Sequence, residues 1–260
     1  MNGRRSLLAA AAIALLTALV LLTGCSSKGD GTDVVAKFSK SSFAALLAAA
    51  KDKVSWSVED SSWVLESPGG DKFLLAVDFS RNSSKASMPG AAMPDMAVPD
   101  AELVFDAAPF LAAGLDQEKL ATVVPADSNF IYEIEDGMFM LHFELGSVAF
   151  AGLSPEDAAK EGGFAKTFDA FVASQRARIG YHAKLDHYNI ALGGGNMVEW
   201  AKDMAKNDKD LVFVLEPALL IAAGLDPAKV EGWIYADVAV VNDTGKEVLV
   251  KKLLRPFDLK

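Results

Sequence analysis

The chain has 260 residues, of which 35 are acidic and 25 are basic, so its formal net charge is −10. This charge argues against a nucleic-acid partner, because binding to phosphates depends on basic side chains that replace counterions. Apolar residues make up 51% of the chain, which favours a packed core over disorder, and the single cysteine excludes an internal disulfide.

The first 25 residues carry the features of an export signal. Arg4 and Arg5 give a short positive start, and an apolar run over 7–22 follows. This run is shorter than the roughly 18–20 residues that a membrane-spanning helix needs. The segment ends on Leu22-Thr23-Gly24-Cys25. Its charge, apolar length and cysteine position together resemble the leader and lipobox of bacterial lipoproteins.

The resemblance implies that Cys25 is lipidated and becomes the first residue of the mature protein. Residues 1–24 are then a signal peptide, and the Gly/Ser-rich residues 25–32 are a lipidated flexible tether. Acyl chains such as palmitate would hold the protein at a bacterial membrane, with the folded domain on the non-cytoplasmic side of the cell envelope. An uncleaved N-terminal membrane helix is the alternative interpretation.

The rest of the chain contains one pattern twice. Residues 105–116 and 215–226 share an Ala-Ala-Gly-Leu-Asp block, and the segments that begin at 42 and 167 also align. Several matching blocks in the same order predict an internal duplication. We expect a first unit over 33–148 and a second over 149–260. Blocks that precede this region are separated from their copies by 15 more residues than the blocks that follow it. The first unit therefore carries a Met/Pro-rich insertion at about 81–98.

Each unit is predicted to begin with a helix, over 42–54 and 167–179, because apolar residues recur there at helical spacing. Alternating apolar runs then follow, joined by glycine-rich turns at 68–71 and 193–195, which predicts antiparallel hairpins.

The shared Ala-Ala-Gly-Leu-Asp block is typical of a helix end, with Gly114 and Gly224 as left-handed caps. A last hairpin follows in each unit, at 131–145 and 233–254. The predicted fold class is therefore α+β, with two tandem similar units that are each an antiparallel sheet covered by helices on one side.

Residues that could carry chemistry are sparse. The chain has no phosphate-binding glycine loop, dinucleotide fingerprint, hydrolase elbow or zinc-protease motif, so we expect neither enzyme activity nor a cofactor. His182 and His187 are the best candidates for a metal ion. On a single strand they would point to opposite faces, whereas a turn between them would bring them together. A hairpin without a ligand is the simpler interpretation.

The insertion contains Met88, Met93 and Met96 among four prolines. Three thioethers could bind Cu(I), or a flexible methionine-rich loop could contact an apolar partner. A weakly ordered surface loop is the simpler interpretation. The four tryptophans could line a cleft, but their positions in alternating runs favour core packing.

These features predict a membrane-anchored cell-envelope lipoprotein with a non-enzymatic binding role. Its partners would be the bilayer, through acylated Cys25, and a small solute, a peptide or an envelope protein. The seam between two similar units is where such a ligand is expected, because clefts between units are common ligand sites. One alternative is a structural or assembly lipoprotein that acts through protein–protein contacts. Another is copper handling through the Met-rich loop.

Overall fold

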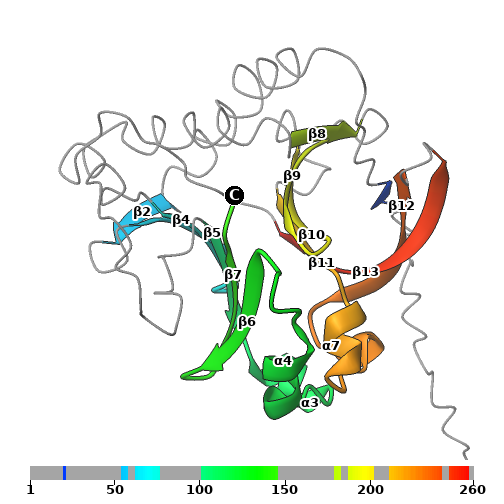
Figure 1. Cartoon of the computed structure of the whole chain (residues 1–260). Coiled ribbons are helices and arrows are strands. Elements are labelled where there is room, and N and C mark those ends of the chain that lie inside the picture. Colours follow the sequence, from blue (N-terminus) through cyan, green and yellow to red (C-terminus); the bar gives the residue numbers. More distant parts are fainter. Residues whose placement is uncertain are drawn as a thin grey trace, which may run out of the picture.

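The computed structural model describes eight stretches of the chain, which form two β-sheets and a few short helices (Figure 1). The described residues are 20–21, 54–57, 62–76, 101–145, 179–182, 187–201, 211–241 and 246–257. Among them, no helix is both long enough and apolar enough to cross a lipid bilayer.

The first sheet is antiparallel and has the strand order β2-β3-β4-β5-β7-β6. Its strands are β2 (Val54–Ser57), β3 (Ser62–Glu66), β4 (Lys72–Ala76), β5 (Ala101–Asp106), β6 (Phe130–Glu135) and β7 (Met138–Phe143). The predicted turn at 68–71 joins β3 to β4, and a two-residue turn at Asp136 and Gly137, both with positive φ, joins β6 to β7.

The second sheet repeats this order as β8-β9-β10-β11-β13-β12. Its strands are β8 (Ile179–His182), β9 (His187–Gly193), β10 (Asn196–Ala201), β11 (Leu211–Leu215), β12 (Ile234–Val241) and β13 (Glu247–Phe257). These strands are antiparallel, and the short β1 (Val20–Leu21) adds a parallel pair at the outer edge of β12.

Short helices follow β5 and β11 at equivalent places. They are α3 (Ala108–Ala112) and α4 (Gln117–Val123) in the first half, and α7 (Ala218–Ala222) and the 3-10 helix η4 (Pro227–Lys229) in the second. They lie together at one end of the two sheets, not over a sheet face (Figure 1). The expectation of two units built on antiparallel sheets is confirmed in this coarse form.

The described residues are mainly β-strand, so the helical part of the predicted α+β class stays a prediction. The helices expected over 42–54 and 167–179 lie outside the described residues except for their last positions. There the prediction was wrong, because Val54 and Ile179 are the first residues of β2 and β8. Both are β-branched, and each pairs with a residue of the next strand, so strand pairing wins over the helical spacing.

The inner faces of the two sheets share one hydrophobic core. The rings of Phe105 on β5 and Phe213 on β11 lie 5.4 Å apart, and those of Phe73 on β4 and Trp200 on β10 lie 6.0 Å apart. Trp63 is also buried, while the remaining two tryptophans are partly buried against the same core, so the expected core packing is confirmed. Each fully buried aromatic side chain contributes on the order of 1.5–3 kcal/mol, which joins the sheets firmly.

The shared sequence block forms the same helix end twice. The N–H of Leu115 donates to the Phe110 carbonyl at 3.0 Å, and the N–H of Leu225 donates to the Leu220 carbonyl at 2.9 Å. These bonds close a Schellman motif, which needs a positive φ at the preceding residue. Gly114 and Gly224 have φ values of +97° and +100°, as the sequence predicted.

The two helix ends also bond to each other in a reciprocal way, and we call this contact the junction. The N–H of Asp116 donates to the Ala223 carbonyl at 2.9 Å, and the N–H of Asp226 donates to the Ala113 carbonyl at 2.8 Å. A Cβ on Gly114 would lie 3.0 Å from the Gly224 carbonyl oxygen, and a Cβ on Gly224 would lie 2.9 Å from that of Gly114. Both glycines are therefore required for their backbone conformation and for the close approach of the two chains.

We predict that Gly114→Ala destabilises the protein more than Gly70→Ala. Gly70 also has a positive φ, of +87°, but a Cβ there would meet nothing within 4 Å. Both variants lose about 1–2 kcal/mol for a left-handed backbone, and only Gly114→Ala adds the overpacking cost of about 1–3 kcal/mol. The measurement is urea unfolding of the two variants. Equal free energies of unfolding would contradict the close approach at the junction.

Candidate functional site

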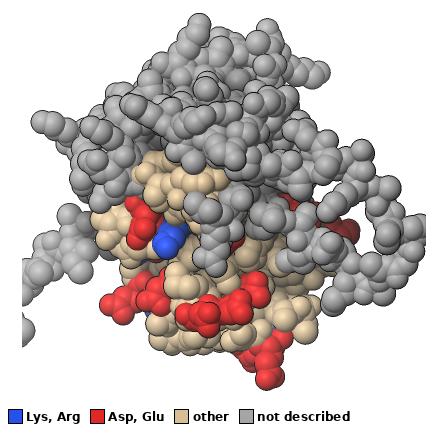
Figure 2. Space-filling model, turned by 90° about the vertical axis from the view of Figure 1, so that its left-hand side faces the viewer, with Lys and Arg blue, Asp and Glu red and all other residues tan. Residues whose placement is uncertain are grey.

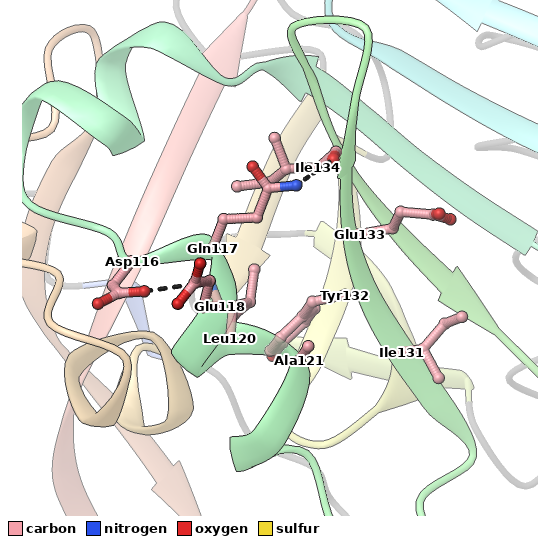
Figure 3. A pocket seen from close by; sticks show the side chains of 9 residues that line it. All are labelled: Asp116, Gln117, Glu118, Leu120, Ala121, Ile131, Tyr132, Glu133 and Ile134. Carbon is pink, nitrogen blue, oxygen red and sulfur yellow. Dashed lines mark hydrogen bonds between the residues drawn. The ribbon is translucent and has the colours of Figure 1, made fainter.

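A groove runs between α4 and β6, the edge strand of the first sheet, and encloses about 940 Å³. Figure 3 shows α4 on one side and β6 on the other, with the side chains of Leu120 and Tyr132 between them. The residues that line the groove are Asp116, Gln117, Glu118, Leu120 and Ala121 from the helix side and Ile131, Tyr132, Glu133 and Ile134 from the strand. One end of the groove adjoins the junction, since Asp116 belongs to both.

The helical wall of the groove begins at Asp116, whose side chain caps α4. One carboxylate oxygen accepts hydrogen bonds from the N–H groups of Glu118 and Lys119, each at 3.1 Å. The Lys119 ammonium lies 3.3 Å from the other oxygen. The N–H of Lys119, followed by its ammonium group, lowers the pKa of Asp116 below its ordinary value. Asp116 is therefore an ionised carboxylate at neutral pH, and it is stabilised at the positive end of the helix dipole.

The strand wall of the groove offers backbone groups. The side-chain amide of Gln117 donates to the Ile134 carbonyl at 2.8 Å, so this carbonyl points away from β7 and toward the groove (Figure 3). In a strand the N–H and C=O of alternate residues point to the same side. The backbone groups of Tyr132 therefore face the groove as well. Among the described residues, no strand pairs with this edge of β6.

Tyr132 forms the buried floor of the groove. Its side chain packs into the shared core, and its hydroxyl accepts a hydrogen bond from the Asn196 amide at 3.4 Å. Burial raises the pKa of Tyr132 to about 12, and the charge of Glu216 acts in the same direction, against the hydrogen bond from Asn196. The hydroxyl is therefore neutral throughout the physiological range, and the acidic character of the groove comes from its carboxylates alone.

The rim of the groove is acidic. Asp116 and Glu118 contribute carboxylates, while the Glu133 side chain points away from α4 (Figure 3), and the lining contains no Lys or Arg. The nearby Lys119 is paired with Asp116. Figure 2 shows that carboxylates also dominate the charged groups on the described part of the face that it displays. A ligand of this groove is therefore expected to carry positive charge.

Glu133 also belongs to a cluster on the face of the first sheet that points away from the core. His142 on β7 lies between β5 and β6, with Nδ1 3.2 Å from a Glu102 oxygen and Nε2 3.3 Å from a Glu133 oxygen. Burial acts to lower the pKa of His142, but the contacts and charges of the two glutamates outweigh it, so the pKa is raised above its ordinary value. A protonated imidazole between two carboxylates is the form that this arrangement stabilises.

The two histidines expected to hold a metal are brought together. His182 on β8 and His187 on β9 are direct cross-strand partners, as the alternative with a turn between them required. His187 is buried, and its Nδ1 lies 3.2 Å from a Glu199 oxygen. Among the side chains that the structure describes, no cluster of three His, Cys, Asp or Glu residues has the geometry of a metal site.

The other predicted site residues are not placed. Cys25 and the methionines of the insertion, Met88, Met93 and Met96, lie outside the described residues, so the lipidation and copper hypotheses stay predictions. The expected seam between the units is filled by aromatic side chains of the core, and the groove lies within the first unit. No sequence motif marks the groove, although its first residue, Asp116, closes the repeated block.

Comparisons of the chain with protein-family models, with curated proteins and with solved structures find no match.

Proposed function

We propose that the protein is a lipid-anchored cell-envelope protein that binds an extended, cationic peptide segment in the groove between α4 and β6. The anchor is inferred from the resemblance of residues 1–25 to a lipoprotein leader, with Cys25 as the lipidated residue. The observation that carries the binding role is the open edge of β6 beside the carboxylates of Asp116 and Glu118. A peptide would add a strand to this edge, since unpaired edge groups are a template for such pairing.

The Gln117 contact supports this mode of binding. The side-chain amide of Gln117 has the same donor chemistry as a backbone N–H, and it already bonds to the Ile134 carbonyl. The next groove-facing residue on the strand, Tyr132, offers a further donor and acceptor to an incoming chain. Ala121, which is exposed on the helix side, supplies an apolar contact for a side chain of the peptide, and such contacts are how strand-adding sites gain specificity.

The second sheet supports the same interpretation. The strand that occupies the position of β6 in its order is β12, and the outer edge of β12 pairs with β1, which adds a parallel strand (short blue strand beside β12 in Figure 1). Val20 pairs with Val238, and Leu21 pairs with Ala239. These two residues belong to the expected leader. In the chain that still carries its leader, the equivalent sheet edge thus accepts an added strand.

The charge of the groove sets the class of peptide. The carboxylate of Asp116 is ionised, and Glu118 is exposed at the rim. Lysine or arginine side chains that alternate along an extended peptide could reach this rim while their neighbours pack on Ala121. Rim carboxylates act mainly through the rate of association and through partner choice, so binding is expected to weaken as salt is added.

We predict that Cys25→Ser releases the protein from the membrane fraction. A serine cannot form the thioether, so the acyl chains that hold the protein at the bilayer are lost. The measurement is membrane fractionation of the producing cells together with incorporation of labelled palmitate. A Cys25→Ser variant that keeps the label and stays in the membrane would contradict the anchor. That outcome would leave the groove untouched, so the two parts of the proposal fail separately.

We predict that a fluorescein-labelled seven-residue peptide alternating lysine and valine binds the wild-type protein. Glu118→Lys should raise its Kd at least about tenfold, because a charge at the rim is reversed. The matched control is Glu231→Lys, which makes the same change at an exposed position outside the groove lining. Fluorescence anisotropy at low and at physiological salt measures the Kd values.

A second peptide separates strand addition from simple charge attraction. Methylation of alternate backbone nitrogens removes the N–H donors that would pair with β6 and keeps every charge. This peptide should lose binding to the wild-type protein. Equal binding of the methylated and unmethylated peptides, or an equal Kd for Glu118→Lys and Glu231→Lys, would contradict the proposed function.

A further inference from the structure

The outer face of the first sheet, which points away from the shared core, carries polar side chains in contact across three strands. His142 on β7 is the direct cross-strand partner of Glu102 on β5. Glu133 on β6 is the partner of Met140, which is two residues from His142 along β7. Residues two apart on a strand share a face, and so do direct partners on neighbouring strands. The imidazole and the two carboxylates therefore meet on one surface, at the β6 edge of the sheet.

The imidazole of His142 faces a carboxylate at each of its two nitrogens. Nδ1 lies 3.2 Å from a Glu102 oxygen, and Nε2 lies 3.3 Å from a Glu133 oxygen. Both nitrogens are shielded from solvent, and neither has a well-aligned hydrogen-bond partner among the described residues. A neutral imidazole has a proton on one nitrogen and a lone pair on the other, so one carboxylate would face a lone pair. The imidazolium ion is instead attracted by both carboxylates.

The other charged groups described on this face lie farther from the imidazole. Glu144 is exposed just after the end of β7, two residues from His142. Asp106 on β5 and Glu135 on β6 lie opposite a β7 residue four positions from His142, which is about 13 Å along a strand. Lys72 is on β4, and β5 lies between β4 and β7. The charge that acts on the imidazole therefore comes mainly from the two carboxylates in contact with it.

Proton binding at His142 is linked to the stability of the fold. Burial alone would lower the pKa of His142, but the contacts and charges of Glu102 and then Glu133 outweigh it, so the pKa lies above its ordinary value of 6.5. In the unfolded chain the imidazole returns to that ordinary value. A group whose pKa is raised by folding stabilises the fold fully below its unfolded pKa. This contribution is lost as the pH rises through the folded pKa.

We propose that His142, Glu102 and Glu133 form a proton-dependent clamp that fastens the edge strand β6 to the first sheet, closed at mildly acidic pH and open at alkaline pH. Among the described strands, β6 is held by β7 alone. The clamp adds a link between side chains that runs from β6 across β7 to β5. Loss of the proton leaves two carboxylates on either side of a neutral ring, and the attraction is lost. The clamp does not depend on the proposed peptide binding.

The first measurement is the pKa of His142, followed by NMR titration of the imidazole resonances in the full chain purified in detergent. The chain has three histidines, so single His→Gln variants assign the resonances. The pKa should lie above 6.5. Glu102→Gln should lower it most and Glu133→Gln less. The reason is that the Glu102 side chain is 15% exposed and that of Glu133 is 46% exposed, and water screens the more exposed charge.

The matched control for the titration is Glu135→Gln. It makes the same change on the same strand and the same face, at a residue that does not contact the imidazole. Its effect on the pKa of His142 should be much smaller than that of Glu102→Gln. The glutamine variants keep the shape of the side chain, and circular dichroism checks that each is folded.

The second measurement is hydrogen exchange at the β6 amides of Ile131 and Glu133, which face β7. Protection factors remove the intrinsic effect of pH on exchange. In the wild-type chain they should fall at least about threefold between about pH 6 and about pH 8.5, and in His142→Gln they should change less. An ordinary or lowered pKa for His142 would overturn the clamp. So would equal pKa shifts in Glu102→Gln and Glu135→Gln, or equal pH responses of β6 in the wild-type chain and in His142→Gln.

Discussion

The junction between the two helix ends is the contact on which the rest of the described structure depends. It joins the two sheets through a pair of backbone hydrogen bonds, from Asp116 to Ala223 and from Asp226 to Ala113. The chains can approach this closely only because Gly114 and Gly224 have no side chain. Asp116 also caps α4 with its carboxylate. The residue that joins the two halves therefore also positions the helical wall of the groove.

Equal topology does not make the two halves equivalent in chemistry. After the junction the first half continues into the seven residues of α4, whereas the second forms only the three residues of η4, which begins at Pro227. A helix long enough to form a groove wall is thus described in the first half only. His187, Asn189 and Glu199 of the second half have no counterparts either. The positions that align with them in the first half are Ser62, Val64 and Leu74. The groove therefore depends on one half of the molecule.

Local sequence signals were sufficient to predict the hairpin turns and the helix ends formed by the repeated block. The glycine caps and the hairpin turns follow from residues within a few positions of one another, because backbone conformation is decided locally. Strand register could not be read in this way. The contact between Glu102 and His142 joins residues forty positions apart, and that between His187 and Glu199 depends on the pairing of β9 with β10. The groove was hidden for the same reason, since α4 and β6 meet only through the fold.

Hydrogen exchange at the amides of Asp116 and Asp226 tests the junction most directly. If the two helix ends bond to each other as described, both amides exchange as slowly as those of the core strands β5 and β11, because opening either bond requires the sheets to separate. In Gly114→Ala both amides should exchange faster together. Exchange of either amide at the rate of an exposed loop, or acceleration of one without the other, would contradict the junction as the contact that joins the two halves.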